Sequence, residues 1–314
     1  MPKTCSEPLH RLQLHGPTMA TRWAVSCDVP PALDANALRQ ALAEAIVQVD
    51  AQMSPWKPES ALNQLNRSPV GDWLALPAQI LEVLARALEV CRLSDGAFDP
   101  AVGALVDAWG FGAARDAPDA EAIRAARNTE RLPTPQALEL DLAAGLARKH
   151  SPLQLDLCGI AKGYAVDRMC AVLTGHDVCH ALVALDGELR AIGPQASGAP
   201  WAVALESPRA GLRAAHGVIE LQDLAVATSG DYRHFVQVGQ ARLAHSMDGR
   251  SGKPVNNGVS SVTVLAPRCI DADAWATALL VAGPGQGLAL AHRGEALVEL
   301  GSGRFAAAAP AGTA

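Results

Sequence analysis

The stretch Asp156-Leu-Cys-Gly-Ile-Ala-Lys-Gly-Tyr164 joins a predicted strand at 153–157 to a helix predicted from Ile160 onward. Its glycines allow another backbone to approach closely, and Lys162 falls in the first turn of the helix. Such a junction presents backbone N–H groups and a cation to a phosphate or a ribose. It is neither a P-loop nor a GxGxxG fingerprint, so an ordinary strand–turn–helix with a solvated lysine stays open as the alternative.

The segments before this junction carry both strand and helix patterns. Apolar alternation predicts a strand pair that begins near Leu12 and resumes at Thr21 after Gly16-Pro17. Apolar residues three and four apart predict helices at 34–53, capped by Asp34, and at 78–93. The other expectations for this part are a short helix at 119–128 and surface loops at 113–120 and 128–137.

The segments after the junction group as strands separated by turn signals, with helices beside them. This grouping favours an α+β fold with antiparallel or mixed sheets over a doubly wound βαβ series. The expected strands lie at 181–192, 200–206, 217–227, 232–245, 260–266 and 295–300. Helices are expected at 271–282 and 284–293, with a break at Gly283-Pro-Gly-Gln-Gly287.

Composition excludes several classes of protein. Hydrophobic residues make up 49% of the 314 and charged residues 18%, which is typical of a globular chain. The net charge of −6, with no basic run, argues against binding nucleic acid through its phosphates. No apolar stretch predicts a signal peptide or a transmembrane segment. Seven cysteines without a CxxC pair favour reduced thiols, so we expect a cytoplasmic protein, or a periplasmic one if a leader has been removed.

Asp273 and Thr277 form the first candidate site, in Asp271-Ala-Asp-Ala-Trp-Ala-Thr277. Four residues apart on a helix, they share one face and offer two hard oxygen ligands. Such a pair suits magnesium, which commonly uses one or two carboxylates together with substrate phosphates and water. The alternative is an aspartate that caps the start of an alanine-rich helix.

Two further stretches carry chemically useful side chains. In Ala244-His-Ser-Met-Asp-Gly-Arg-Ser-Gly252, His245 and Asp248 can remove a proton from a hydroxyl near neutral pH, unless the histidine simply belongs to a turn. In 96–112, Phe98 and Asp99 precede Pro100, a predicted first residue of a helix. An aromatic ring and a carboxylate at such a corner can hold a planar heterocycle, although an aromatic core turn explains them equally well.

Taken in order along the chain, these stretches resemble the ApbE family, the FAD:protein FMN transferases. The resemblance runs from about Met19 to about Gly283. It is carried by Met19-Ala-Thr21, Met53-Ser-Pro-Trp56, Ser60-Ala-Leu-Asn-Gln-Leu-Asn66, 96–112, 156–167, 227–232, 244–252 and 272–278.

The resemblance implies a role for particular positions. It implies that FAD lies in a cleft between two closely joined subdomains of a single catalytic domain spanning 1–314, one of about 10–150 and one of about 151–306. The implied FAD-lining residues are Met19, Trp56, Ala97, Phe98, Asp99, Asp156, Lys162 and Met247. The carbonyl of Gly159 and the side chains of Asp273 and Thr277 would hold magnesium, with His245 and Asp248 near the chemistry.

The implied reaction is the magnesium-dependent transfer of FMN from FAD to a threonine or serine of an acceptor flavoprotein subunit, with release of AMP. His245 or Asp248 would act as the base. Two alternatives stay open: a magnesium-dependent FAD pyrophosphatase that uses water as the nucleophile, and a flavin-binding protein with little catalysis.

The chain departs from the family pattern at a few places. Cys158 stands where a glycine is usual, Ala20 replaces a glycine, and Gly249 replaces a proline. The run Ala184-Leu-Asp-Gly-Glu188 replaces Asp-Leu-Gly-Gly-Asp, so two acidic positions, now Asp186 and Glu188, have moved or changed. None of these departures removes an implied metal ligand; they bear on the shape of the flavin pocket.

Overall fold

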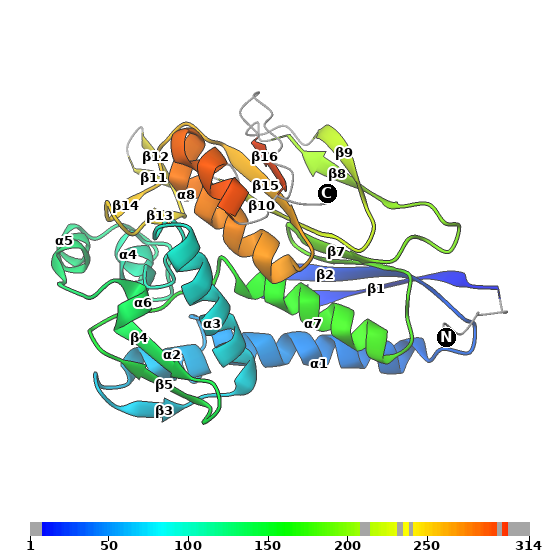
Figure 1. Cartoon of the computed structure of the whole chain (residues 1–314), viewed down its shortest axis with the longest axis horizontal. Helices are drawn as coiled ribbons and strands as arrows, with labels where there is room; N and C mark the ends of the chain where they lie inside the picture. Colours follow the sequence, from blue (N-terminus) through cyan, green and yellow to red (C-terminus); the bar gives the residue numbers. More distant parts are fainter. Residues whose placement is uncertain (1–7, 208–213, 231–234, 239–240, 294–296, 301–314) are drawn as a thin grey trace.

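A twisted antiparallel sheet forms the centre of the protein (Figure 1). The computed structural model describes residues 8–207, 214–230, 235–238, 241–293 and 297–300. Within them the main sheet has seven strands in the order β1-β2-β6-β7-β10-β15-β16. These are β1 (His10–Thr18), β2 (Thr21–Val29), β6 (Ala181–Leu185), β7 (Glu188–Ile192), β10 (Ala225–Gly230), β15 (Ser261–Ala266) and β16 (Leu297–Leu300). Every pairing is antiparallel, which agrees with the predicted α+β fold.

Three long helices pack beside this sheet. They are α1 (Ala35–Met53), α7 (Ala161–Gly175) and α8 (Cys269–Arg293), and α7 contacts both of the others (Figure 1). Helix α8 packs on β10 and β15, while α7 packs on β6 and β7. A fourth long helix, α3 (Ala78–Leu93), packs against α1 and α8. The buried stripe of α1 includes Leu38, Leu42, Ile46 and Val49, and Asp34 caps it, as predicted.

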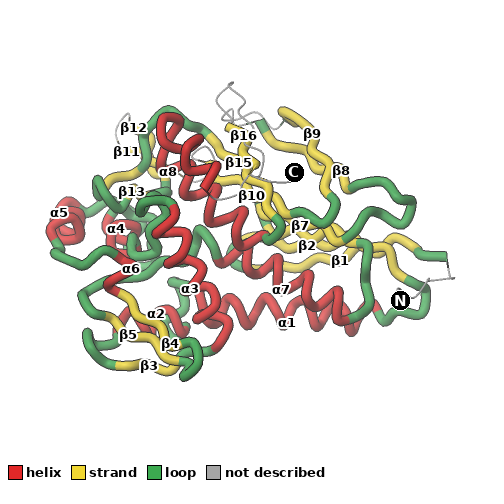
Figure 2. Tube along the Cα trace, in the orientation of Figure 1, coloured by secondary structure: helices red, strands yellow, loops and turns green. Residues whose placement is uncertain are grey.

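Smaller elements surround this frame (Figure 2). A three-stranded sheet has the order β3-β5-β4. It consists of β3 (Trp73–Ala75), β4 (Leu138–Asp141) and β5 (Leu146–Lys149). The short helices are α2 (Ala61–Arg67), α4 (Gly103–Ala108), α5 (Ala120–Asn128) and α6 (Thr134–Ala137). Three two-stranded ribbons are β8 (Trp201–Glu206) with β9 (Ala215–Leu221), β11 (Phe235–Val238) with β12 (Ala241–Ala244), and β13 (Met247–Asp248) with β14 (Lys253–Pro254).

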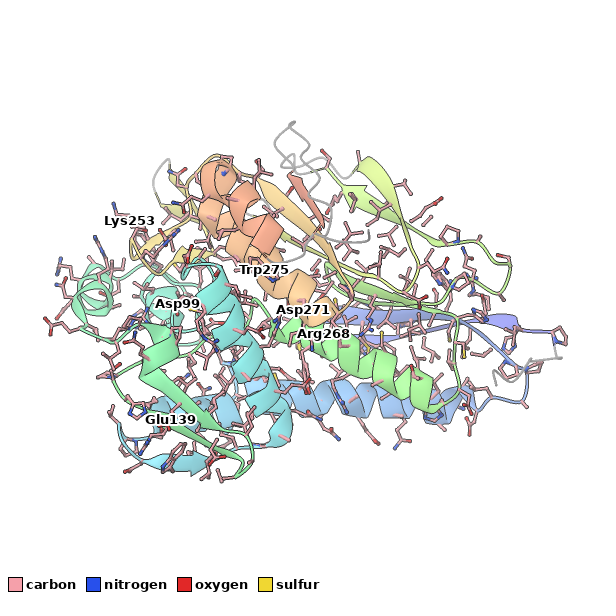
Figure 3. All side chains as sticks on the ribbon, viewed as in Figure 1. Asp99, Glu139, Lys253, Arg268, Asp271 and Trp275 are labelled. Atoms are coloured by element: carbon pink, nitrogen blue, oxygen red, sulfur yellow. The ribbon has the colours of Figure 1, made fainter. Side chains whose placement is uncertain are left out.

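The core is one large apolar cluster with a smaller one beside it. The large cluster joins residues from Leu14 on β1 to Ala291 on α8, and the small cluster is built around Trp201. The side chain of Trp275 on α8 has no exposed surface (Figure 3). Burying an aromatic ring of this size removes roughly 150–250 Å² from water, so α8 is anchored at its centre. The single catalytic domain stays a prediction.

The segment 153–157 is not a strand, and that prediction was wrong. Its leucines alternate inward as predicted, because Leu153, Leu155 and Leu157 are buried. No strand in the described part of the chain pairs with it; instead the side chain of Asn66 accepts from Leu155 N (2.7 Å) and donates to Leu155 O (3.0 Å). The alternation therefore predicted burial correctly, but the backbone of this segment bonds to the Asn66 side chain and to the backbone of Pro100 and Gly103.

Several other boundaries differ from the predictions because tight turns divide the chain further. The predicted strands 181–192 and 217–227 each contain a turn, at Asp186 and Asp223, whose φ values are 55° and 53°. The described part of 232–245 is a hairpin. The first hairpin turns at Met19-Ala20 and not at Gly16-Pro17. Pro100 is not the first residue of a helix, since α4 begins at Gly103, and the predicted loop 128–137 contains α6.

Helix α8 is broken where the sequence predicts. Helical structure runs from Cys269 to Arg293, but Gly283 has φ 71° and ψ −179°, and Pro284 follows it. The two expected helices are therefore two halves joined at a kink. By length and composition, Cys269–Ala291 is apolar enough to cross a membrane, yet 61% of that window is buried inside the protein, and a core helix has the same character.

The start of α8 is fastened to α7 and β7 by one carboxylate. Asp167 on α7 accepts hydrogen bonds from Cys269 N (3.0 Å) and Ile270 N (2.9 Å) and pairs with Arg190. These two N–H groups have no partner within the helix, so a carboxylate there stabilises its first turn. Asp167 therefore sets how α8 meets α7.

We expect Asp167→Asn to lower the free energy of unfolding by about 2 kcal/mol, because it removes a charged cap and leaves Arg190 unpaired. Urea unfolding followed by tryptophan fluorescence measures this change. The control is Asp177→Asn, at an exposed position just after α7, where we expect a change within about 0.5 kcal/mol. Equal losses in both variants would refute the capping role.

Candidate active site

A cavity of about 1220 Å³ opens where the ends of the main elements meet. Its wall includes the β1–β2 turn, the loop after α1, the β6–β7 turn, the end of β10 and one face of α8. Pockets for drug-sized ligands span roughly 300–1,000 Å³, so this one is large enough for a dinucleotide. The lining includes Met19, Trp56, Ala97, Phe98, Asp99, Asp156, Gly159, Lys162, His245, Met247, Asp273 and Thr277.

Two glycines let α8 approach the start of α7 at the floor of the cavity. A Cβ on Gly163 would lie 2.3 Å from the carbonyl oxygen of Cys269 and 2.7 Å from Cβ of Asp273. A Cβ on Gly159 would lie 2.9 Å from Oγ1 of Thr277. Side chains at either position would separate the two elements, so the glycines bring Gly159, Asp273 and Thr277 together.

Asp273 is the buried carboxylate of this floor. It is 3% exposed, and its Oδ2 accepts a hydrogen bond from Gly163 N (2.9 Å). Burial raises the pKa of Asp273, while the nearby Lys162 ammonium and this hydrogen bond lower it, and burial dominates. A carboxylate placed here is stabilised when a cation binds beside it.

The donor set at the floor fits a magnesium ion. Gly159 would supply a carbonyl, Asp273 a carboxylate and Thr277 a hydroxyl, and Thr277 Oγ1 lies 3.2 Å from Ser229 Oγ. Hard oxygen ligands of this kind, completed by substrate phosphates and water, are typical of magnesium sites. In the described residues no three His, Cys, Asp or Glu side chains cluster as metal ligands, so a cation here would depend on the Asp273 carboxylate together with carbonyl, hydroxyl and phosphate oxygens.

Lys162 stands above this floor between two carboxylates. Its Nζ lies 2.9 Å from Glu188 Oε1 and 3.3 Å from Asp186 Oδ2. Burial lowers the pKa of Lys162, but Glu188, Asp273 and Asp186 raise it by more, so the ammonium stays charged. Burial also raises the pKa of Glu188, whose Oε2 has no hydrogen-bond partner among the described residues. The alternative of a freely solvated lysine is thus wrong.

Asp186 and Glu188 are site residues that the sequence predictions did not assign. Both line the cavity, and both follow from the altered run at 184–188. The sequence feature that could have identified them is the change in acidic positions around the β6–β7 turn. Their meaning needed the structure, because only the fold brings β7 beside Lys162 on α7.

Asp156 and Cys158 form a polar turn at the edge of the floor. The Cys158 N–H donates to Asp156 Oδ1 (2.7 Å). Burial raises the pKa of both side chains, and the Asp156 carboxyl further raises that of the thiol. The Cys158 thiol is therefore kept neutral, which makes it a poor nucleophile.

Other predicted FAD-lining residues also border the cavity. Phe98 is 4% exposed, and its ring lies 3.5 Å from the position of a Cβ on Gly159, whereas Trp56 is 58% exposed at the rim. Met19 and Ala20 form the β1–β2 turn with φ values of 44° and 58°. Ala20 therefore adopts a left-handed conformation that a glycine adopts at lower cost, which explains why glycine is usual there.

Asp99 lines the cavity but its carboxylate is already engaged. Oδ2 accepts from Arg131 Nη2 (2.7 Å), and Oδ1 accepts from Thr134 Oγ1 (2.7 Å) and Ala101 N (2.9 Å). The residue therefore shapes the corner that carries Phe98 and is not available as a base.

His245 and Asp248 have different surroundings in the structure. His245 lines the cavity, whereas Asp248 is not among the lining residues. Asp248 Oδ1 accepts from Arg250 N (3.1 Å) and Arg250 Nε (3.0 Å). Burial raises the pKa of Asp248, but the hydrogen bonds from Arg250 outweigh it and hold this pKa below its ordinary value. Of the two, His245 is the better placed to accept a proton.

Comparison with known proteins identifies the family. A model of the ApbE family matches residues 19–299. The chain belongs to the ApbE family. A relative from Vibrio cholerae named FAD:protein FMN transferase is 35% identical over 291 residues, which are 92% of this chain and 86% of the relative.

Solved structures of the ApbE family share the fold. The flavin transferase ApbE from Vibrio cholerae has a TM-score of 0.83 at 33% identity and covers 93% of this chain and 94% of its own. The apo form of the flavinyl transferase ApbE from Pseudomonas stutzeri has a TM-score of 0.81 at 32% identity, with 93% of each chain covered. These likenesses confirm the predicted family and fold, and the names agree with the predicted class, a flavin transferase.

Proposed function

We propose that this chain is an FAD:protein FMN transferase, which moves FMN from FAD to a threonine or serine hydroxyl of an acceptor flavoprotein and releases AMP. Membership of the ApbE family and the names of its relatives support the proposal. The observation that carries it is the floor of the large cavity, where α8 brings Asp273 and Thr277 against the Gly159 turn. A binding protein has no need of such an oxygen-rich floor beside a histidine.

Gly159, Asp273 and Thr277 would hold magnesium, which when bound would neutralise charge on the FAD pyrophosphate. Lys162 offers a charged ammonium to the same phosphates, and its carboxylate partners fix its position. Met19, Trp56 and Phe98 would contact the flavin ring from the walls of the cavity. These residues orient FAD with its pyrophosphate at the floor.

The reaction needs a base and an attacking hydroxyl. His245 takes the proton of the acceptor hydroxyl, whose oxygen forms a bond to the FMN phosphorus. The bond from that phosphorus to the bridging oxygen breaks, and AMP leaves with the bonding electron pair. Water in place of the hydroxyl would give FMN and AMP, which is the pyrophosphatase alternative.

Mass spectrometry separates the three candidate activities. The protein is incubated with FAD, magnesium and a flavin-dependent redox subunit that carries a threonine or serine acceptor. AMP with an FMN adduct on the acceptor supports transfer, and AMP with free FMN supports hydrolysis. FAD binding without AMP would refute both and leave a flavin-binding protein. The location of the protein, cytoplasmic unless a leader has been removed, stays a prediction.

We expect His245→Asn to slow FMN transfer by about 100-fold or more, because a general base contributes roughly 10²–10⁴ to a rate. FAD binding, measured by flavin fluorescence, should change little, since the loss lies in proton removal. The control His176→Asn alters an exposed histidine at the end of α7 and should leave transfer unchanged. Full transfer activity in His245→Asn would exclude this base.

A further inference from the structure

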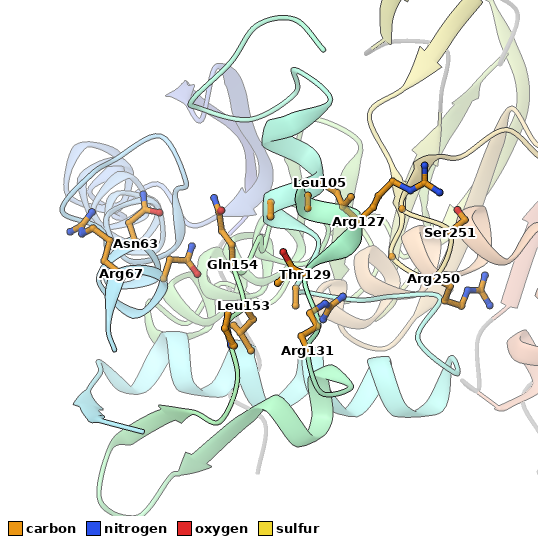
Figure 4. A pocket seen from close by; sticks show the side chains of 17 residues that line it. Asn63, Arg67, Leu105, Arg127, Thr129, Arg131, Leu153, Gln154, Arg250 and Ser251 are labelled. Carbon is orange, nitrogen blue, oxygen red and sulfur yellow. The ribbon is translucent and has the colours of Figure 1, made fainter. Parts of the chain in front are cut away.

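A second cavity of about 640 Å³ lies between α2, α4, α5 and the β13–β14 turn (Figure 4). Its lining includes four arginines, Arg67, Arg127, Arg131 and Arg250, and among the described residues no aspartate or glutamate. The whole chain has a net charge of −6, so this is a local concentration of positive charge on an acidic protein. The proposed transfer reaction makes no use of it.

Two of the four arginines carry charge that no described carboxylate offsets. Arg131 pairs with Asp99 (2.7 Å) and Arg250 pairs with Asp248 (3.0 Å). Arg67 donates to the neutral carbonyl of Pro58 (2.6 Å), and within the described residues Arg127 forms no ion pair. The cavity therefore presents a net positive charge to solvent.

The aliphatic stem of Arg127 lies against a glycine turn. A Cβ on Gly252 would lie 2.6 Å from Cγ of Arg127 and 3.2 Å from its Nε, so the arginine stem lies directly on this turn. Gly252 is itself buried, and its carbonyl accepts from Trp109 Nε1 (3.2 Å). The stem of Arg127 therefore packs on this turn, while the residue as a whole is exposed.

The arginine-lined cavity shares a wall with the large cavity. Asp99 lines the large cavity while its partner Arg131 lines the small one. Along one strand and turn, Met247 faces the large cavity and Gly249 the small one, and a Cβ on Gly249 would lie 2.9 Å from Asp99 Oδ2. A ligand in the small cavity would therefore lie next to the site proposed for FAD.

We propose that the arginine-lined cavity binds a carboxylate-bearing segment of the acceptor polypeptide and so guides its hydroxyl residue toward the large cavity. The inference rests on the proposed function. The guanidinium fork matches a carboxylate through two parallel hydrogen bonds. Figure 4 shows Arg67 on one side of the cavity and Arg127, Arg131 and Arg250 on the other, so an extended chain with several carboxylates can engage both sides.

Fluorescence anisotropy with labelled peptides tests the proposal. The probes are short peptides of equal length with one central threonine, flanked either by Asp and Glu or by Lys, added to the full chain loaded with FAD. We expect the acidic peptide to bind more tightly than the lysine peptide, with an affinity that falls as salt rises. Arg127→Glu should weaken binding of the acidic peptide by about tenfold or more, because an attraction becomes a repulsion.

Arg124→Glu is the matched control, since Arg124 is an exposed arginine on the same helix α5 outside the cavity. It should change peptide affinity by less than about twofold. Equal losses in the two variants, or no preference for the acidic peptide, would overturn the proposal. Displacement of the acidic peptide by low concentrations of inorganic phosphate would instead identify a phosphate site and overturn it as well.

A different experimental result would refute the proposed function. If the chain releases no AMP from FAD with magnesium, the transferase and hydrolase hypotheses are both wrong, whatever the peptides show. FAD binding should be the same in Arg127→Glu, Arg124→Glu and the wild type, because neither arginine lines the large cavity.

Discussion

Asp273→Asn is expected to lower magnesium-dependent release of AMP from FAD by about 100-fold or more. The asparagine has the shape of the aspartate and keeps an oxygen for the Gly163 N–H, which now bonds to Asp273 Oδ2 at 2.9 Å. It lacks the negative charge that a divalent cation requires. The rate of AMP release at rising magnesium concentration measures the effect, and calorimetry measures magnesium affinity.

Stability distinguishes this loss from unfolding. Asp273 is buried, so an uncharged amide removes the cost of burying a charge, and the metal-free variant should be at least as stable as the wild type. The control is Asp271→Asn, which changes a carboxylate on the same helix that pairs with Arg86 and Arg268 away from the cavity (Figure 3). Asp271→Asn should retain AMP release. Normal magnesium affinity in Asp273→Asn would remove this residue from the metal site.

Gly163→Ala is expected to cost roughly 3 kcal/mol of folding free energy and most of the magnesium-dependent activity. The added methyl would lie 2.3 Å from the Cys269 carbonyl oxygen and 2.7 Å from Cβ of Asp273. Both contacts are far inside van der Waals distance, and the first is to backbone, which cannot rotate away. Helix α8 must shift from α7, and Asp273 moves away from the Gly159 carbonyl.

Gly175→Ala is the matched control on the same helix. Among the described residues no atom lies within 4 Å of the position of a Cβ on Gly175, so alanine should leave stability unchanged or raise it by up to about 1 kcal/mol through its higher helix propensity. Urea unfolding and AMP release are measured for both variants. If Gly163→Ala is as stable and active as Gly175→Ala, close approach of α7 and α8 is not required.

Local patterns predicted much of the fold because they depend on neighbours along the chain. The cap at Asp34, the buried stripe of α1 and the break at Gly283 follow from helix chemistry that acts over a few residues. The segment 153–157 shows the limit of prediction from local patterns. Its alternation correctly predicted burial, but its hydrogen bonds go to Asn66, Pro100 and Gly103, which are distant in sequence, and not to a neighbouring strand.

For the candidate site too, the motifs predicted which residues take part, and the structure showed which of them are in contact. The motif resemblance selected residues that line the large cavity and named His245 or Asp248 as the base, but only the structure shows that Asp248 bonds to Arg250. It noted Asp186 and Glu188 only as departures, because their partner Lys162 lies on another element. The arginine-lined cavity had no local pattern at all, since its arginines come from separate segments.

The sequence by itself determined the family, the α+β class and twelve of the residues that line the large cavity, because short motifs and the periodicity of apolar residues carry this information. The tertiary structure alone decided which of those residues meet, which carboxylates are already paired and where positive charge gathers. The physical reason is that ion pairing, burial and close helix contact depend on distances between elements, and such distances are set only when Gly159 and Gly163 let α8 pack against the start of α7.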